Sequence, residues 1–160
     1  MAVDMFIKLQ GIEGESKDSK HPNEIDVLAW SWGVTQSGSF HHGGGGGSGK
    51  ANFQDLSFTK WVDKSSPILM LHCASGTHIP VVDLVVRKAG DKPLEYIKIK
   101  LEKVIVSSLS TGGSGGESKL TENVSLNFAK VTVNYQEQSA TGAAEGGEVP
   151  FTWDIEANVK

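Results

Sequence analysis

The 160-residue chain has little cysteine, no long apolar segment and no excess of positive charge. Its single cysteine, Cys73, excludes an internal disulfide framework and is typical of a protein that folds in a reducing compartment. No segment approaches the roughly 20 apolar residues needed to cross a bilayer, so we expect no membrane insertion. With 15 basic and 19 acidic residues the formal net charge is −4, which disfavours nucleic acid as a partner.

The N-terminal string MAVDMFIKLQGIEGESKD has neither the basic region nor the sustained apolar region of a cleaved signal peptide. We therefore expect synthesis in the cytoplasm, and any export must use a route that does not read a signal peptide. The length, with 38% hydrophobic and 21% charged residues, predicts one domain spanning residues 1–160.

Period-two alternation of apolar side chains is the dominant pattern and predicts strands with one buried face. Strands are expected near residues 3–9, 25–40, 53–61, 78–88, 94–109, 120–136 and 148–156. In two of them the apolar positions change phase, between Leu101 and Val104 and between Phe128 and Val131. A one-residue slip flips the buried face, so each of these strands is expected to contain a bulge or sharp bend. The fold class predicted is mainly β, a small β-barrel of two antiparallel sheets with bent strands.

One short α-helix is predicted to flank the barrel, at about residues 66–75. Ser65 or Ser66 can cap it, Pro67 suits its first turn and Gly76 can end it. Its run ILML is apolar on nearly every side, so we expect the helix to be buried on more than one face, with a neighbouring molecule as one candidate partner.

Two glycine-rich stretches between strands predict long loops at about residues 41–50 and 111–118. The first contains GGGGSGK at positions 44–50, part of a phosphate-binding loop, but Ala51 follows the lysine and a strand follows in place of a helix. The second contains GGSGG around Ser114, the pattern of a nucleophile elbow, yet every histidine precedes it and a strand comes next. We expect neither a nucleotide site nor hydrolase activity.

The remaining polar residues do not form a catalytic or metal-binding pattern. His41 and His42 are adjacent, so their side chains point apart on a regular element, and no CxxC or HxxxH spacing is present. We therefore expect no metal, no cofactor and no catalytic residue, and the protein is not expected to be an enzyme. A monomeric β-barrel binding module for a small ligand or glycan is the alternative, and it would need a concave pocket with convergent polar groups.

Four longer strings carry a family resemblance. They are MAVDMFIKLQGIEGESKD, IDVLAWSWGVTQSGSF, QDLSFTKWVDKSSPILM and STGGSGGESKLTENVSLNFAKVTVNY, in that order along the chain. Together they closely resemble the haemolysin-coregulated proteins, Hcp, of bacterial type VI secretion systems. The match covers essentially the whole chain and is less close over His72–Leu94 and Ala140–Val149.

This resemblance implies a structural role. Members of the family form a small β-barrel with a helix on its flank, and six copies join head to tail into a ring around a wide channel. Rings stack into a tube that is tipped by a spike protein of the valine-glycine repeat family and surrounded by a contractile sheath. The tube is propelled out of the cell, so the protein is secreted, and the lumen can receive and shield effector proteins.

Two sets of residues are candidates for these roles. If Leu28, Trp30 and Trp32 pack inward, the small residues Ala29 and Ser31 face outward and are expected to line the lumen, although an ordinary solvent-facing or sheet-paired position fits the same pattern. The loop that resembles the family's ring-stacking loop consists of Phe40, His41, His42, Gly43, Gly44, Gly45, Gly46, Gly47, Ser48, Gly49 and Lys50.

Overall fold

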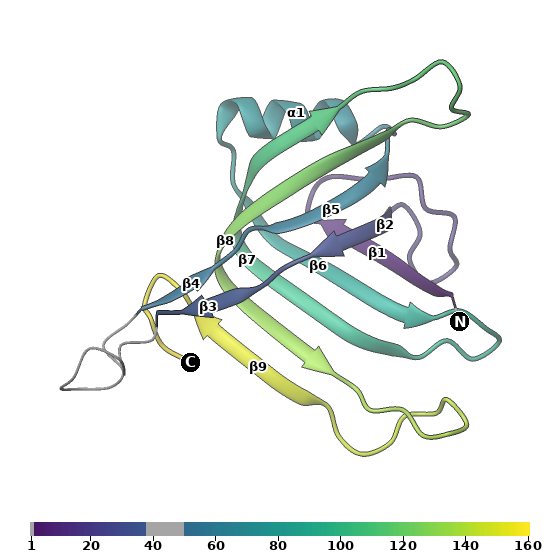
Figure 1. The fold of residues 1–160 in the computed structure, drawn as a ribbon, viewed down its shortest axis with the longest axis vertical. Coiled ribbons are helices and arrows are strands. Elements are labelled where there is room, and N and C mark those ends of the chain that lie inside the picture. The colour runs from purple at the N-terminus through teal and green to yellow at the C-terminus, as the bar shows by residue number, and fades with distance from the viewer. Residues whose placement is uncertain (1, 38–49) are drawn as a thin grey trace.

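The computed structural model describes residues 2–37 and 50–160. In these ranges the chain forms nine strands and one helix (Figure 1). The strands are β1 (Val3–Leu9), β2 (Ile25–Ser31), β3 (Val34–Gln36), β4 (Ala51–Phe53), β5 (Leu56–Trp61), β6 (Ile79–Lys88), β7 (Glu95–Thr111), β8 (Thr121–Tyr135) and β9 (Val149–Asp154). The helix α1 (Ser66–Ser75) connects β5 to β6.

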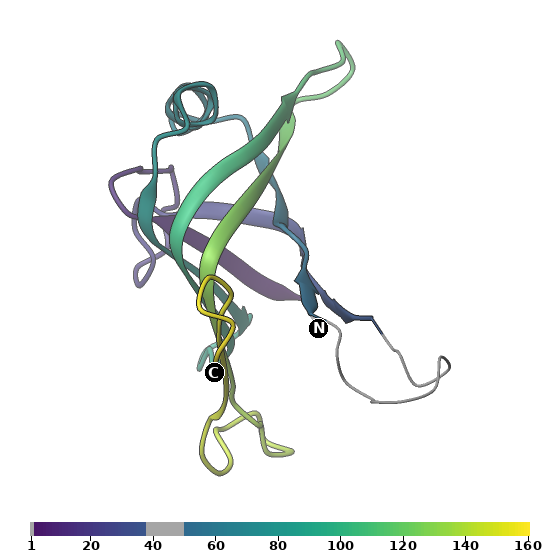
Figure 2. The same cartoon turned by 90° about the vertical axis from the view of Figure 1, so that its left-hand side faces the viewer.

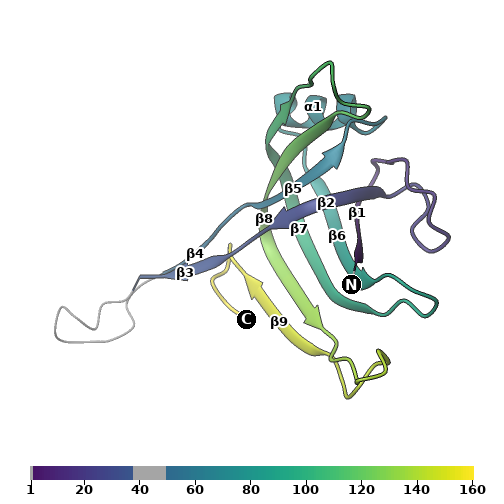
Figure 3. The ribbon, with the colours of Figure 1, turned by 45° about the vertical axis from the view of Figure 1, so that its right-hand side comes forward.

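Six strands close into a barrel. They pair antiparallel in the order β5-β2-β1-β6-β7-β8, and β5 also pairs with β8 to complete the circle. β9 extends the sheet along the second half of β8, while β3 and β4 form a separate two-stranded ribbon that projects from the barrel (Figure 3). Figure 2 shows α1 nearly end-on, above one end of the barrel. The predicted mainly β fold, a small antiparallel barrel with one short helix, is confirmed, and the barrel strands form one closed sheet in place of two.

The barrel encloses an apolar core because alternate side chains of each strand point inward. Ile7, Leu84 and Leu101 are among the side chains that this core buries completely or nearly so. Phe6 breaks the alternation, because it is buried although it lies on the outer side of β1. The segment between β1 and β2 crosses this side of the barrel and places the His21 ring on Phe6 at a centroid distance of 4.5 Å.

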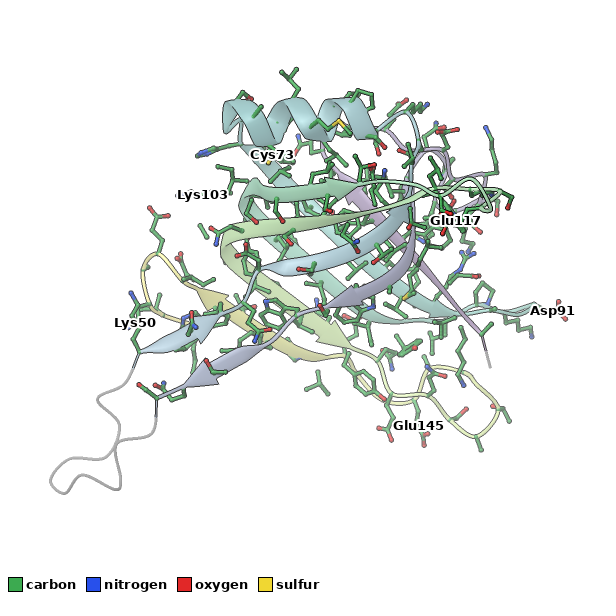
Figure 4. All side chains as sticks on the ribbon, turned by 45° about the horizontal axis from the view of Figure 1, so that its top comes forward. Lys50, Cys73, Asp91, Lys103, Glu117 and Glu145 are labelled. Atoms are coloured by element: carbon green, nitrogen blue, oxygen red, sulfur yellow. The ribbon has the colours of Figure 1, made fainter. Side chains whose placement is uncertain are left out.

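β7 and β8 bend at the same level of the sheet. Lys103 (Figure 4) has a left-handed backbone φ of 53°. Ala129 occupies the facing position in β8, between the partners of Glu102 and Val104. The carbonyl of Ala129 accepts a 2.8 Å hydrogen bond from the N–H of Ile155. The buried side chains change phase on either side of Lys103 and Ala129, so the predicted bends are confirmed. β8 pairs with β5 before its bend and with β9 after it.

The predicted burial of β2 was wrong in its first half. Val27 is buried at 6% exposure, while Leu28 is exposed at 37%. The pairing register with β5 shifts between Val27 and Ala29, which places a bulge at Leu28 and turns its side chain away from the core. Beyond the bulge Trp30 packs against the core as expected, and Ala29 is exposed.

The helix has the predicted bounds, with Pro67 in its first turn and a left-handed Gly76 that donates its N–H to the His72 carbonyl. Ser65 is the N-cap residue, but its side chain does not cap the helix. Within one chain α1 buries only Ser66 and Leu69, so the expected burial on several faces is not met by the subunit alone. No helix in residues 2–37 and 50–160 has the length and apolar character needed to cross a membrane.

Candidate functional site

A wall of small side chains covers the outer side of β2, β5, β8 and the last part of β7. Each strand contributes two residues that stand opposite those of the next strand, with at most one position of offset at a bulge. They are Ala29 and Ser31 of β2, Thr59 and Ser57 of β5, Asn123 and Ser125 of β8, and Ser110 and Ser108 of β7. None of these residues carries a charge, and all are exposed or half-buried. We call this surface the polar wall.

The polar side chains that β5 and β8 contribute to this wall are hydrogen-bonded to one another. The hydroxyls of Ser57 and Ser125 are 2.9 Å apart, and the Thr59 hydroxyl donates to Asn123 Oδ1 at 2.7 Å. At the border of the wall Asp55 accepts hydrogen bonds of 2.6 and 3.0 Å from side chains of β7 and β8. The wall therefore presents a smooth surface of small neutral groups, without a strong charge that would select one partner chemistry.

Both edges of the polar wall lack a strand partner among the described residues. β1 pairs with β2 at two positions and diverges after Phe6–Asp26, so β2 has an open edge over residues 27–31. β6 pairs with β7 only as far as Val104, so β7 has an open edge over residues 105–111. Because β2-β5-β8-β7 is antiparallel throughout, the two edge strands run in opposite directions. The edge of β2 in one molecule can therefore pair antiparallel with the edge of β7 in another.

Apolar side chains are exposed at two places near this wall. Ile68 and Leu71 of α1 are 38% and 64% exposed. β8 and β9 continue past the closed barrel (Figure 1). On the core-facing side of this extension Tyr135, Val149 and Phe151 are exposed. Exposed apolar patches of this kind commonly mark contacts with other proteins.

A buried ion pair fastens α1 to the end of the barrel. Lys60 of β5 and Glu122 of β8 are cross-strand partners, and both side chains are 0% exposed. Lys60 Nζ also lies 3.0 Å from Asp63 Oδ1 and donates to the Ser66 hydroxyl at 3.1 Å. Ser66 in turn donates to the Glu122 carboxylate at 2.5 Å. The first turn of α1 is thereby attached to β5 and β8, beside the free edge of β7.

The sequence analysis did not predict this ion pair. A usable signal was present in the alternation of each strand. Lys60 shares its phase with the buried Leu56 and Phe58, and Glu122 shares its phase with Val124. When a basic residue on one strand and an acidic residue on another both occupy positions in phase with the buried residues of their strands, an ion pair that faces the core is predicted.

An aromatic cluster holds the base of the projecting ribbon. The Trp32 ring lies 6.1 Å from that of Phe53 and 6.4 Å from that of Phe128, and Phe53 lies 6.4 Å from Trp153. These residues join the ends of β2 and β4 to β8 and β9. Trp32, Phe53 and Trp153 pack against the barrel core.

The structure places the candidate residues from the sequence analysis in different parts of the molecule. Ala29 and Ser31 both lie on the polar wall. The predicted stacking loop, Phe40–Lys50, falls outside the described residues except for Lys50. Lys50 is exposed just before β4 (Figure 4). Ser114 is exposed in the loop between β7 and β8. Within the described ranges no three His, Cys, Asp or Glu residues are grouped so that they could hold a metal ion.

Comparison with known proteins places this barrel among the proteins of type VI secretion systems. Residues 6–135 match the family described as "Type VI secretion system effector, Hcp". Protein hcp1 of Pseudomonas aeruginosa is 62% identical over 161 residues, which cover 100% of this chain and 99% of that protein. The chain belongs to the Hcp family.

Solved structures of the family share the fold. The crystal structure of Hcp1 from Salmonella typhimurium is 42% identical, with a TM-score of 0.82 and 99% of each chain covered. A type VI secretion system effector from Yersinia pestis is 39% identical, with a TM-score of 0.78, and the match covers 95% of this chain and 100% of that one.

Proposed function

We propose that the protein is a structural subunit of the type VI secretion inner tube, in which six copies close into a ring and the rings stack. The observation that carries this proposal is the pair of open edges on the polar wall, one on β2 and one on β7. A closed ring of identical copies needs two different surfaces that fit each other. These two edges fit by strand direction, so joining them continues the four-stranded wall from copy to copy.

The polar wall then faces the channel, and Ala29 and Ser31 line the lumen. Their neighbours on β5 and β8 are hydrogen-bonded to one another. These polar groups therefore need no specific hydrogen-bond partner on the molecule inside the channel. This property suits a lumen that receives and shields effector proteins of differing surface chemistry.

The helix supports the ring behind this wall. α1 packs against β7, so pairing of the β7 edge brings the exposed Ile68 and Leu71 toward the adjoining copy. The core-facing side of that copy exposes Val149 and Phe151 beyond its barrel. Burying a large apolar side chain contributes about 1.5–3 kcal/mol, so this second contact would strengthen closure considerably.

The other surfaces are assigned to the remaining partners. The outer side of β1, β6 and β7 carries alternating charges, with Asp83 between Lys8 and Lys100, and this side faces the contractile sheath. In Figure 1 the loop between β7 and β8 lies at the top, near α1, whereas the loops that join β6 to β7 and β8 to β9 lie toward the bottom. These ends, with the Phe40–Lys50 loop, meet the next ring or the valine-glycine repeat spike. The role requires no cofactor and no catalytic step, and the protein leaves the cell through the secretion system.

Cysteine cross-linking tests the proposed edge pairing. In a Cys73→Ser background, the pairs Ser31→Cys with Ser108→Cys and Ala29→Cys with Ser110→Cys place one thiol on each edge strand. Within one chain these strands are separated by β5 and β8, which puts them roughly 14 Å apart. A short bismaleimide that spans less than this distance should therefore link different copies, giving a ladder on a denaturing gel that ends at six chains.

A matched pair, Ser31→Cys with Thr132→Cys, puts the second thiol on β8 beyond its bend, away from the polar wall, and should give no ladder. If both edge pairs stay at the mass of one chain, the pairing is wrong, and a lone barrel with a bound small ligand would favour the binding-module alternative.

A further inference from the structure

The segment between β1 and β2, residues 10–24, folds as one unit, which we call the β1–β2 loop. The Gly14 N–H donates to the Asn23 carbonyl at 2.8 Å, and the Ser16 N–H donates to the Glu24 carbonyl at 2.9 Å. A Cβ atom at Gly14 would lie 2.5 Å from the Glu24 carbonyl oxygen, so only glycine allows the two arms to approach this closely. These contacts join the two arms of the loop to each other.

His21 attaches this loop to the barrel through both ring nitrogens. Nδ1 lies 2.8 Å from Glu24 Oε2 within the loop, and Nε2 lies 2.7 Å from Glu95 Oε1 at the start of β7. The ring stacks on Phe6 with an interplanar angle of 11°, and the residue is buried. Both contacts have the length of charge-assisted hydrogen bonds.

These two contacts cannot both be hydrogen bonds to ionised carboxylates unless the imidazole is doubly protonated. A neutral imidazole carries one N–H, and its other nitrogen presents a lone pair. That lone pair would face carboxylate oxygens, which also present lone pairs, so one of the two contacts must open. Imidazole is the side chain that ordinarily changes its charge between pH 5 and 8.

We infer that the β1–β2 loop is a pH-dependent clasp, closed while His21 carries two ring protons and released from Glu95 when it loses one. Glu95 is the contact that opens, because its side chain is 30% exposed and can turn to water, whereas that of Glu24 is 13% exposed. Glu24 also belongs to the loop itself, so keeping its bond does not hold the loop to β7.

A second attachment survives this change. The groups that surround the stacked His21 and Phe6 rings are Glu24 and Asp18 of the loop, Asp4 of β1, Arg87 of β6 and Glu95 of β7, with Lys20 and Lys88 nearby. Arg87 lies over the other side of the Phe6 ring at 4.9 Å and pairs with Asp18 and Asp4. This pairing lowers the pKa of Asp18 to about 2, so the Asp18–Arg87 contact stays charged at neutral and alkaline pH. Loss of the His21 proton thus loosens the loop without detaching it.

Release would reshape a surface cavity of about 610 Å³ beside the helix. Pro22, Asn23 and Glu24 form part of its wall, and Ile68 of α1 and Lys64 form another part. The clasp therefore links the proton state of His21 to the shape of a cavity next to α1.

Hydrogen–deuterium exchange of the full chain tests the clasp. Protection of residues 10–24, corrected for the pH dependence of chemical exchange, should fall roughly tenfold between pH 6 and pH 9, as expected for the loss of one hydrogen bond to a charged group. The variant Glu95→Gln should keep its protection constant over this range. Its amide can accept from the protonated ring and can donate an N–H to Nε2 of the neutral ring. The matched variant Glu148→Gln removes an exposed carboxylate that pairs with Lys98 and should behave like the wild type.

Nitrogen-15 NMR of the imidazole supplies an independent readout, and both His21 nitrogens should be protonated at pH 6. Constant protection in the wild type would overturn the inference. So would an unchanged pH dependence in Glu95→Gln, loss of that dependence in Glu148→Gln, or a singly protonated ring at pH 6 with the loop still protected.

Discussion

Lys60 and Glu122 face each other across β5 and β8 with both charged ends sealed inside the barrel. One oxygen of Glu122 accepts from Lys60 and Ser66, while Oε2 has no hydrogen-bond partner among the residues that the structure describes. Moving two charges out of water is costly, and their attraction offsets this only while both are present. The pair therefore positions α1 and makes the barrel sensitive to the loss of either partner.

Replacing Lys60 alone should destabilise the fold strongly. Lys60→Met leaves the Glu122 carboxylate buried without its cation, and loss of one partner of such a pair costs about 3–5 kcal/mol. The double variant Lys60→Met with Glu122→Leu removes both charges and should recover most of the loss. Urea unfolding of the three proteins measures this, and a double variant no more stable than Lys60→Met would contradict the assignment.

Glycine is required at position 14 by the close approach of the loop arms. Gly14→Ala should cost about 1–3 kcal/mol of unfolding free energy, the range for forced overpacking. Gly112→Ala is the matched control, because a Cβ there meets nothing within 4 Å and its change should stay within about 0.5 kcal/mol. Equal effects at the two positions in thermal or urea unfolding would show that the arms can separate freely.

The sequence was sufficient to predict the long bent strands, because each strand has a clear alternation of apolar and polar residues both before and after its bend. Leu101 and Val104 are three positions apart, and so are Phe128 and Val131. In a regular strand the two members of each pair would point to opposite faces, so both can be buried in the core only if the strand bends or bulges between them. β2 could not be resolved in the same way. Val27 and Leu28 are both apolar, so alternation alone does not reveal which one a bulge turns outward.

Contacts between segments that are distant in the sequence also could not be predicted from the alternation of apolar residues. Phe6 interrupts the alternation of β1, but only the tertiary structure shows that His21 and Arg87 cover it. The inward ion pair left a trace in strand phase, whereas the meeting of Ser66 with Glu122 depends on how α1 crosses the barrel end. The polar wall likewise appears only when β2, β5, β8 and β7 are placed in order.

Acid should weaken the attachment of the β1–β2 loop through Asp18. The Arg87 side chain donates to this carboxylate and lowers the pKa of Asp18 from 3.8 to about 2 in the folded protein. A carboxyl with a lowered folded-state pKa stabilises the fold fully above its unfolded value and loses that contribution as pH falls through the folded value. The melting temperature should therefore decrease between pH 4 and pH 2, and less steeply in Asp18→Asn. Identical slopes in the two proteins would contradict the coupling.

A bulky side chain on the polar wall should interfere with cargo and leave assembly intact. Ser31→Tyr projects a ring from the β2 surface that is proposed to line the lumen, so co-purification of effector proteins should fall while ring particles persist in micrographs. Thr132→Tyr, beyond the bend of β8, serves as the control and should leave cargo unchanged. Normal cargo retention in Ser31→Tyr would remove Ser31 from the channel surface.

A charge on the exposed side of α1 should weaken ring closure without unfolding the subunit. Leu71→Asp places a carboxylate where contact with the apolar side of the adjoining copy is proposed, and burying an unpaired charge is strongly unfavourable. Sedimentation should show dissociation at concentrations where the wild type remains assembled. Val159→Asp alters another exposed apolar residue and should have no such effect. Equal dissociation of both variants would contradict a specific role for α1.

The direct measurement is native mass spectrometry of the purified protein over a range of concentrations, with negative-stain micrographs of the same samples. Closure through the β2 and β7 edges predicts a species of six chains and annular particles with six-fold symmetry. A single-chain mass at every concentration, with no annular particles, would contradict it.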